Sequence, residues 1–561
     1  MANSLYSDLQ NDEFRLLKAF YDQNRVLSCN MTAFNLDSHP AYTALSYAWG
    51  KELFAVPISC NGETINISRS LLSAFEAFVE CPSLQTPEWV WADFLCINQK
   101  DEAEKAVQIR VMDQIYKKAE IVTIWSGTGD VKTQESLRTL ENFGCMIARS
   151  PPIHSMDYVM SLSGDPQWTE LEPFFRREWF TRSWVVQEVL LAQKARLVCG
   201  TTSIDWNKVI DLYLGCLEES QSNKVMLIRH ELGYNVLRSL YDLSRKLGSS
   251  YYDLELLNLI RQRVCKEPVD KVYSILGLIN PEVRAKIVID YKIDPWSIFI
   301  RLAQELLKHH GPDVFILAPS VERPPELPSW VPNLLSSPLM THAWYKHTAS
   351  KLEEATGVDP EYKIPDKAAL LTVDAPGICM AIIGNVYPLP DLSDGIITEH
   401  HARELLEAVK FCRTIWAQRN QKFKLKENVL TLIGGVVSRR EGLERPIMDE
   451  FNEMIRNLKG FLNGDMFNTP NAHFMQSMMD AWKGACLFTT EDNHVGLGPK
   501  TMQRGDKVWI FFKASTPFVL RGNKDRVTHQ LLGPAYIHTF MDGTAFEAKN
   551  PRETYEILTI Q

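Results

Sequence analysis

The chain is 561 residues long, which allows about three to four domains at roughly 150 residues per domain. Apolar residues make up 45% of it and charged residues 23%, the composition of a folded chain rather than a disordered one. A net charge of −9 excludes a protein held on nucleic acid or anionic lipid by a general basic field.

The cysteines and the apolar runs indicate the compartment. Eleven cysteines without a Cys-x-x-Cys pair are not the pattern of a secreted disulfide scaffold. The N-terminus lacks the basic and then apolar segments of a secretory signal. The longest apolar stretch, residues 429–437, is too short to cross a bilayer. We therefore expect a cytoplasmic protein with no transmembrane segment.

Strands and helices alternate through the first 205 residues. Apolar runs predict strands at residues 14–20, 25–35, 43–48, 56–59, 64–67, 89–94 and 121–125. The Asn61-Gly62 pair predicts a tight hairpin turn, and Ser68 or Ser70 can cap a helix over residues 71–79. A second helical face runs through residues 101–120. The order strand, helix, strand favours a parallel α/β sheet.

The pattern changes twice further along the chain. Helices are expected at residues 225–246, 252–264, 296–310, 400–419 and 446–463, and strands at residues 507–512, 518–520, 530–532 and 536–539. Prolines between residues 319 and 338 predict an extended connector. We divide the chain into a leading β segment at 1–40, an α/β domain at 41–205, a helical region at 206–318, a Pro-rich connector at 319–345, a mixed α/β region at 346–485 and a β-rich region at 486–561.

Three blocks combine apolar elements with unusual polar and aromatic residues. They are Tyr42-Thr-Ala-Leu-Ser-Tyr-Ala-Trp-Gly50, Trp91-Ala-Asp-Phe-Leu-Cys-Ile-Asn-Gln99 and Trp179-Phe-Thr-Arg-Ser-Trp-Val-Val-Gln-Glu-Val189. In this order and spacing they resemble the signature blocks of the fungal heterokaryon incompatibility (HET) domain family. Two later segments, Asp270-Lys-Val-Tyr-Ser-Ile-Leu-Gly-Leu278 and Leu327-Pro-Ser-Trp-Val-Pro332, also look like segments of full-length members.

The third block carries a carboxylate beside an aromatic wall. Trp184 and Glu188 stand at i and i+4, so a helix would place both on one face. The wall precedes them and consists of Pro173, Phe174, Phe175, Trp179 and Phe180. Partial desolvation there would prepare the carboxylate for catalysis or for orienting a ligand. The alternative is that Glu188 pairs with Arg182 or Arg177 and pins the helix.

HET domains also look like distant relatives of the Toll/interleukin-receptor (TIR) fold, a doubly wound, flavodoxin-like parallel sheet. In that fold the first strand ends in a pair similar to Ser46-Tyr47, and a helix carries Trp-Cys-x-x-Glu, whose spacing Trp184 and Glu188 match with Val185 in place of the cysteine. The glutamate of enzymatic TIR domains supports cleavage of NAD⁺. The resemblance therefore implies NAD⁺ as a substrate and Glu188 as the catalytic residue, with no bound cofactor and no metal.

One carboxylate suffices for this chemistry, because the nicotinamide of NAD⁺ is cationic and departs as a neutral molecule. Ordinary glycosidases need a second carboxyl group to protonate the leaving oxygen. A fixed negative charge would stabilise the oxocarbenium-like transition state. Ligands of open α/β sheets bind outside the carboxyl ends of the strands. The candidate ligand-binding residues are Ser46, Tyr47, Trp49, Asp93, Asn98, Gln99, Arg182 and Trp184.

Several of these residues have structural alternatives. The aromatic side chains can be core residues, and Asp93 and Asn98 can cap the helix that begins near residue 101. Cys96 is expected to be a buried structural thiol, because the blocks contain no histidine to deprotonate it. The adjacent pairs His309-His310 and His400-His401 lack the spacing of a metal site.

The family resemblance implies a role in non-self recognition and programmed cell death at hyphal fusion. We expect assembly of the N-terminal domains to switch on NAD⁺ hydrolysis, so self-association and an incompatibility partner protein are the expected interactions. Two other functions stay open. One is a non-enzymatic oligomerising module that acts through partners, and the other is a biosynthetic enzyme of secondary metabolism built on the same scaffold.

Overall fold

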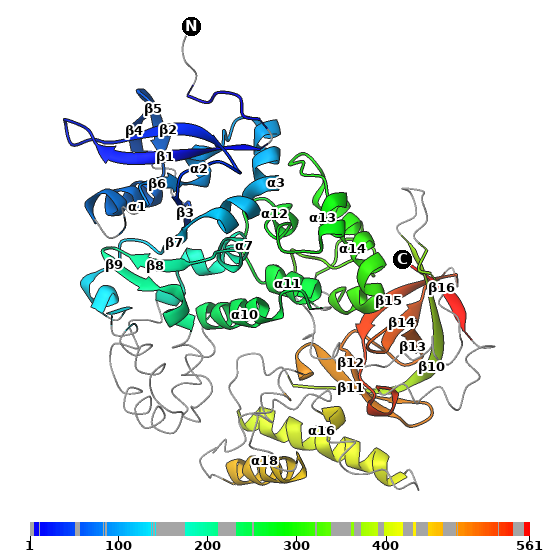
Figure 1. Ribbon diagram of the computed structural model, residues 1–561. Coiled ribbons are helices and arrows are strands. Elements are labelled where there is room, and N and C mark those ends of the chain that lie inside the picture. Colours follow the sequence, from blue (N-terminus) through cyan, green and yellow to red (C-terminus); the bar gives the residue numbers. More distant parts are fainter. Residues whose placement is uncertain are drawn as a thin grey trace. The chain divides into compact units, whose positions relative to one another are not determined.

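The computed structural model divides the chain into two compact units, Met1–Asp294 and Pro295–Gln561 (Figure 1). Each unit is built around one β-sheet. The structure describes residues 5–10, 12–50, 56–81, 84, 87–135, 137–138, 141, 174–210, 232–249, 252–319, 322–337, 361–363, 372–390, 398–418, 430–432, 447–463, 478, 481–524, 527–541 and 555–561.

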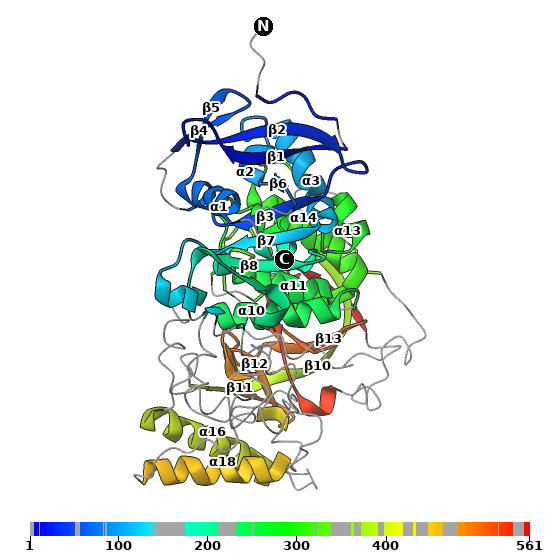
Figure 2. The same ribbon diagram turned by 60° about the vertical axis from the view of Figure 1, so that its left-hand side comes forward.

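The first unit has a nine-stranded sheet in the order β5-β4-β2-β1-β6-β3-β7-β8-β9 (Figure 2). Its strands are β1 Glu13–Tyr21, β2 Leu27–Asn35, β3 Tyr42–Tyr47, β4 Val56–Cys60, β5 Glu63–Ile67, β6 Trp89–Trp91, β7 Ile121–Trp125, β8 Ala195–Cys199 and β9 Thr202–Asp205. All six residues of β3 are buried, so the sheet is covered on both faces at its centre.

The sheet is mixed: its parallel pairs form the run β6-β3-β7-β8 and, separately, the pair β2–β4. Antiparallel pairs flank this run, with β1 beside β6 and β9 beside β8. The leading β segment therefore belongs to the same sheet as the predicted α/β domain, because Leu17 of β1 pairs with Val90 of β6. The prediction of a parallel sheet holds for the run β6-β3-β7-β8 and for the pair β2–β4, and the flavodoxin-like winding stays a prediction.

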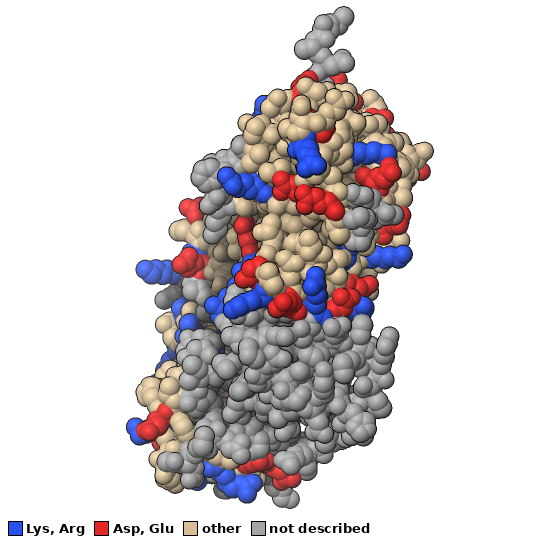
Figure 3. All heavy atoms as spheres, turned by 90° about the vertical axis from the view of Figure 1, so that its left-hand side faces the viewer, with Lys and Arg blue, Asp and Glu red and all other residues tan. Residues whose placement is uncertain are grey.

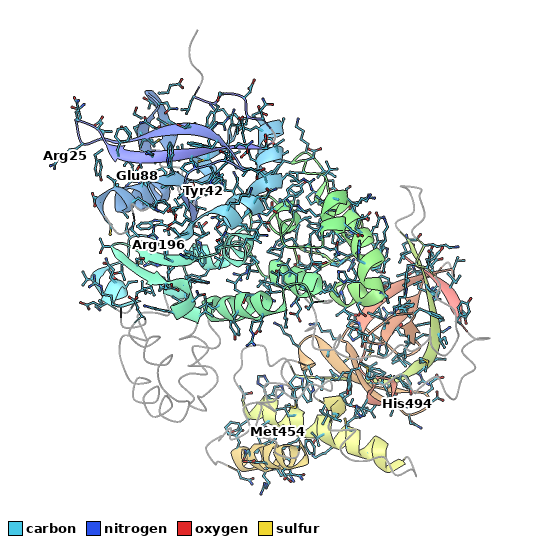
Figure 4. The ribbon with its side chains drawn as sticks, viewed as in Figure 1. Arg25, Tyr42, Glu88, Arg196, Met454 and His494 are labelled. Carbon is cyan, nitrogen blue, oxygen red and sulfur yellow. The ribbon has the colours of Figure 1, made fainter. Side chains whose placement is uncertain are left out.

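Local signals of the first unit form the elements that the sequence predicts. Asn61 and Gly62 both adopt positive φ, 51° and 84°, and turn β4 into β5. Ser68 caps helix α1, Arg69–Glu80, by accepting a hydrogen bond from the Leu71 amide at 3.2 Å. Tyr42, labelled in Figure 4, begins β3 and donates its hydroxyl to the Ile115 carbonyl of the neighbouring helix.

Two predictions around residue 93 were wrong in detail. The strand expected at residues 89–94 ends at Trp91, and a short helix, α2 Asp93–Cys96, follows. Asp101, rather than Asp93 or Asn98, caps helix α3, Glu102–Lys118, through the amides of Ala103 and Glu104. Asn98 instead accepts from the Lys100 amide in a turn before the cap.

Helices complete the first unit. The 3₁₀ turn η1, Glu178–Thr181, leads into α7, Val185–Leu190. The later helices are α10 Leu232–Lys246, α11 Tyr252–Arg261, α12 Asp270–Tyr273 and α13 Pro281–Lys286. The helix predicted at residues 225–246 is confirmed from residue 232, and residues 225–231 lie outside the described part of the chain.

The second unit contains a seven-stranded sheet in which β10 pairs with β11, β13 and β16. The strands are β10 Val373–Pro388, β11 Ala485–Thr490, β12 Val495–Pro499, β13 Lys507–Phe511, β14 Phe518–Gly522, β15 Thr528–Pro534 and β16 Glu556–Ile560. The β10–β16 pairing closes the run β10-β13-β14-β15-β16 on itself. The prediction of a β-rich C-terminal region is confirmed. Residues 536–539, however, contribute one bridge at Tyr536 and the 3₁₀ turn η4, His538–Phe540, rather than a strand.

Helices of the second unit match their predicted positions. They are α14 Pro295–His310, followed by the 3₁₀ turn η2 Gly311–Leu317, and α16 Glu399–Gln418 and α18 Ile447–Leu462. The helices α16 and α18 pack together through an apolar cluster that includes Met454 (Figure 4). Residues 322–337 of the Pro-rich segment are packed rather than free, since Trp330 is fully buried and Arg323 donates to the Val331 carbonyl.

Candidate functional site

A buried hydrogen-bond chain joins the end of β3 to helix α7. The Trp179 indole nitrogen donates to the Ser46 hydroxyl at 2.8 Å, and that hydroxyl donates to the Glu188 carboxylate. Ser46 is fully buried, Trp179 is 1% exposed and Glu188 is 3% exposed. The carboxylate thus lies inside the first unit and is satisfied there by a specific donor.

The local sequence explains why Glu188 points inward. Helix α7 is short and apolar, and its residues Val185, Val186 and Val189 are buried. The aromatic wall predicted before it is confirmed for the described residues: Phe174, Phe175, Trp179 and Phe180 form edge-to-face contacts with centroids 5.0 to 5.5 Å apart. Pro173 lies outside the described residues.

Arg182 supplies the positive charge of the site. It is half-buried, it donates to the Tyr47 carbonyl at the end of β3, and its charge acts on both Glu188 and Asp93. Arg177, the other predicted partner of Glu188, lies elsewhere. It donates to the Ser126 carbonyl at 2.7 Å and lies over the Phe174 ring.

Asp93 forms the second carboxylate of the site. The Trp49 indole nitrogen donates to both of its oxygens, at 3.2 and 3.0 Å, and the Phe94 amide donates at 2.7 Å. The Tyr47 side chain also interacts with this carboxylate. Trp49 and Asp93 are half-buried, so this edge of the site reaches the surface while Glu188 does not.

Burial raises the pKa of both carboxyl groups. Desolvation raises the pKa of Glu188 from 4.5 to about 7, with a smaller contribution from Asp93, while Arg182 and the Ser46 hydrogen bond lower it. Desolvation also raises the pKa of Asp93, and the Arg182 charge and the Trp49 bond oppose the rise. Glu188 is therefore poised to exchange a proton near neutral pH.

The remaining predicted residues divide between support and other contacts. The Gln99 amide donates to the Asp93 carbonyl at 2.9 Å and so supports helix α2. Asn98 bonds through its backbone amide to Glu104 at 2.7 Å. Burial raises the pKa of Asp270 to about 6, and the nearby Tyr291 and Trp184 side chains lower it. Cys96 is fully buried, and burial raises the pKa of its thiol, as expected of a structural cysteine.

Several contributors to the site escaped the sequence reasoning. Trp179 was expected only in the aromatic wall, yet it is the donor that holds Ser46. Tyr116 of α3 donates to the Leu45 carbonyl at 3.2 Å. Burial raises the pKa of its hydroxyl, and the charge of Glu188 raises it further. The Gly277 amide donates to the side chain of Gln187, the neighbour of Glu188. Gly277 and Asp270 lie in the segment at residues 270–278, and its resemblance to segments of family members was the only sequence feature that pointed to it.

The described residues were searched for metal sites and for membrane-spanning helices. Among them, no group of three or more histidine, cysteine, aspartate or glutamate side chains could hold a metal ion. Within the same part of the chain, no helix is both long and apolar enough to span a membrane. Positive and negative side chains are interspersed on the face of the first unit in Figure 3.

Comparison with known proteins places this site in a family. Residues 42–188 match the family model "Heterokaryon incompatibility protein (HET)", and residues 445–557 match the model "Het-6 beta-barrel domain". The first match begins in β3 and ends at Glu188, so it spans the hydrogen-bond chain described above. The chain thus resembles heterokaryon incompatibility (HET) proteins in both of its units.

A relative shares both halves of the chain. The sequence is 21% identical to "Heterokaryon incompatibility protein 6, OR allele" of Neurospora crassa, over 94% of this chain and 93% of that protein. No solved structure matches the chain. The closed sheet of the second unit overlaps the residues of the second family model.

Proposed function

We propose that the protein acts in heterokaryon incompatibility, and that its first unit does so by hydrolysing NAD⁺ when copies of the chain assemble. The family match and the relative named for this process support the first part. The second part rests on one observation above all: Glu188 is buried on Ser46 at the carboxyl end of the central strand β3, with a pKa of about 7.

The proposed reaction breaks the bond between C1′ of the ribose and the nicotinamide nitrogen. The electron pair of that bond leaves with the nicotinamide, which becomes neutral, and a positive charge develops on the ribose. Ionised Glu188 stabilises that charge. A water oxygen adds to C1′, and its proton passes to the Glu188 carboxylate, whose pKa near 7 suits a proton acceptor at neutral pH. The products are ADP-ribose, nicotinamide and one proton.

The half-buried residues at the edge of the site supply the binding groups. Arg182 is suited to the pyrophosphate, because a guanidinium forms paired hydrogen bonds to phosphate oxygens. Asp93 can accept hydrogen bonds from ribose hydroxyls, and the Trp49 ring beside it can stack on a base. These residues lie where ligands of open α/β sheets bind, beyond the carboxyl ends of β3 and β6.

The burial of Glu188 supports the proposed dependence on assembly. At 3% exposure the carboxylate cannot meet a ribose unless the groups around it move. We infer that the single chain is inactive and that association of first units opens the site. This proposal needs no change of covalent structure, only a shift between a closed and an open population.

Release of nicotinamide tests the proposal. Full-length protein is concentrated with a crowding agent, incubated with NAD⁺ and followed by chromatography, beside Glu188→Gln as the matched variant and Glu63→Gln as an exposed control. We expect release by the assembled wild type and by the control, rising as pH increases through about 7, and a loss of at least 100-fold in Glu188→Gln (about 2.7 kcal/mol). Equal release by all three proteins would refute the role of Glu188, and no release by the assembled wild type would refute the hydrolase.

The same burial supports a second function, a non-enzymatic module that assembles and signals through partners. In that case the Ser46–Glu188 bond is a structural feature of the core. Co-expression of incompatible alleles separates the two functions. The hydrolase predicts that Glu188→Gln abolishes cell death without changing the assembled fraction, whereas the interaction module predicts that cell death persists.

A further inference from the structure

Helix α7 is held by a segment that lies outside the matched HET region. The match ends at residue 188, whereas the Asp270–Leu278 segment, which contains α12, contacts α7 and the residues before it. Asp270 accepts from the Tyr291 hydroxyl at 2.8 Å, and the side chain of Trp184, the N-cap residue of α7, acts on the same carboxyl group. We call residues 270–278 the α12 segment.

A backbone bridge ties the turn after α11 to the residues that carry Arg182. The Val264 amide donates to the Thr181 carbonyl at 2.7 Å, and the Ser183 amide donates to the Val264 carbonyl at 3.0 Å. Arg182 lies between these two bonds. The position of the Arg182 side chain thus depends on the conformation of residues 260–264.

Lys271 holds that turn. Its ammonium group donates to the carbonyls of Ile260 at 2.8 Å, Arg261 at 3.3 Å and Arg263. The first two are carbonyls in the last turn of α11, where the helix dipole favours a positive charge. Lys271 is 4% exposed. Removing its charge from water costs free energy, and the surrounding carbonyl acceptors offset that desolvation penalty.

A second contact fixes α7 itself. The Gly277 amide donates to the Gln187 side-chain oxygen at 2.9 Å, and Gln187 is 1% exposed. A Cβ atom at residue 277 would lie 2.3 Å from the Cβ of Asp113 and 2.8 Å from the same Gln187 oxygen. Only glycine therefore allows the α12 segment to approach the residue next to Glu188 this closely.

We propose that the α12 segment is the second half of the candidate site, and that Lys271 is a positioning residue for Arg182 and Glu188. The placement of the two side chains follows from the contacts above. The effect of this placement on catalysis rests on the proposed NAD⁺ hydrolysis. The functional unit is then the whole first unit, and the matched region alone lacks the groups that hold its own site.

A stability cycle tests the positioning without any assay of activity. The melting temperatures of wild type and Glu188→Gln are compared at about pH 5 and about pH 8, in the native background and with Lys271→Met, which removes the ammonium group and keeps an unbranched, slightly shorter side chain. Ser46, Arg182, Asp93 and Tyr116 face Glu188 from the other elements and are unchanged in every protein. We expect the pH-dependent difference that Glu188→Gln causes to shrink by roughly half or more with Lys271→Met, because water reaches a displaced carboxylate.

Arg323→Met is the matched control. Arg323 is also a cation, half-buried, that donates to backbone carbonyls, among them those of Leu327 at 3.4 Å and Val331 at 3.1 Å, but it belongs to the second unit. We expect it to lower the melting temperature and to leave the effect of Glu188→Gln unchanged. If Lys271→Met does not fold, Gln187→Met removes the contact with Gly277 and takes its place.

The outcomes separate this inference from the proposed function. An unchanged effect of Glu188→Gln in the presence of Lys271→Met or its replacement overturns the positioning role, whatever the activity. If Lys271→Met reduces the effect of Glu188→Gln on the melting temperature, and the assembled wild type releases no nicotinamide, the positioning role is supported and the hydrolase is refuted. Where nicotinamide is released, Lys271→Met is expected to lower kcat by tenfold or more and to move the pH midpoint, which general destabilisation does not do.

Discussion

Ser46 donates its hydroxyl to the Glu188 carboxylate across 142 residues of sequence. Both side chains are buried, and the indole of Trp179 holds the hydroxyl from the other side. The bond joins the carboxyl end of the central strand to the short helix α7. A donor this specific keeps a carboxyl group inside the unit and opposes the rise in its pKa that burial causes.

Stability should depend on pH through Glu188. The folded protein keeps a proton on this group up to about pH 7, whereas the unfolded chain releases it near pH 4.5, so stability is lost as pH rises through this window. The rise in pKa corresponds to about 3 kcal/mol. Glu188→Gln cannot ionise, so its free energy of unfolding should gain roughly 2–3 kcal/mol relative to wild type between about pH 5 and about pH 8.

Urea unfolding at the two pH values measures this gain. The matched control is Glu63→Gln, whose side chain is exposed, and its difference from wild type should stay within about 0.5 kcal/mol at both pH values. A Glu188→Gln protein that loses stability relative to wild type as pH rises would contradict the raised pKa.

Ser46→Ala should raise the pKa of Glu188 further, because the Ser46 hydrogen bond lowers it. The pH midpoint of nicotinamide release should move up by about one pH unit, since hydrogen bonds to charged groups contribute about 1.5–3 kcal/mol. The free energy of unfolding should fall by about 1–3 kcal/mol, because the Trp179 indole loses its acceptor. Ser126→Ala removes a buried hydroxyl that bonds to the Val198 carbonyl, so it should cost stability with no change in the midpoint.

Arg182→Met should raise the pKa of both Glu188 and Asp93, because the guanidinium charge lowers both. Nicotinamide release at neutral pH should fall about tenfold for each pH unit by which the midpoint rises, and part of it should return in alkaline buffer. Arg177→Met is the control, since Arg177 bonds to the Ser126 carbonyl instead. Identical pH profiles for the two variants would show that Arg182 does not act on the carboxylates.

Arg15→Met should strongly destabilise the first unit. Arg15 is 2% exposed, forms a salt bridge with Glu104 at 2.6 Å and donates to the carbonyls of Cys96 and Ser7. Loss of the guanidinium leaves the nearly buried Glu104 carboxylate without its opposite charge, which should lower the free energy of unfolding by about 3–5 kcal/mol. Lys18→Met breaks the exposed pair with Glu88 and should have no measurable effect on thermal unfolding. Similar melting temperatures for the two variants would contradict this difference.

The sequence by itself predicted elements whose causes are local. The Asn61-Gly62 turn follows from positive φ, the Ser68 cap from a side-chain acceptor at the first turn, and the strands β1 to β3 from short apolar runs. All of these causes act over a few residues. The same reasoning failed where two local acceptors competed. Asp101 caps α3, although Asp93 and Asn98 were the predicted caps.

The candidate site was predictable as a set of residues but not as an arrangement. The blocks pointed to Ser46, Asp93, Arg182 and Glu188, and the fold brings these four together. Spacing on a helix predicted that Trp184 and Glu188 would share one face, and the Glu188 amide donates to the Trp184 carbonyl at 3.3 Å. The Trp184 side chain also acts on Asp270, which belongs to a segment far along the chain that helix spacing could not predict.

Only the tertiary structure decided which distant groups meet. The order of the sheet places β3 between β6 and β7, so the end of β3 meets a helix that lies far along the chain. The contacts of Lys271 with residues 260–263 and of Gly277 with Gln187 likewise depend on the path of the chain. Short-range periodicity carries no information on such contacts, because they form only when the whole unit packs.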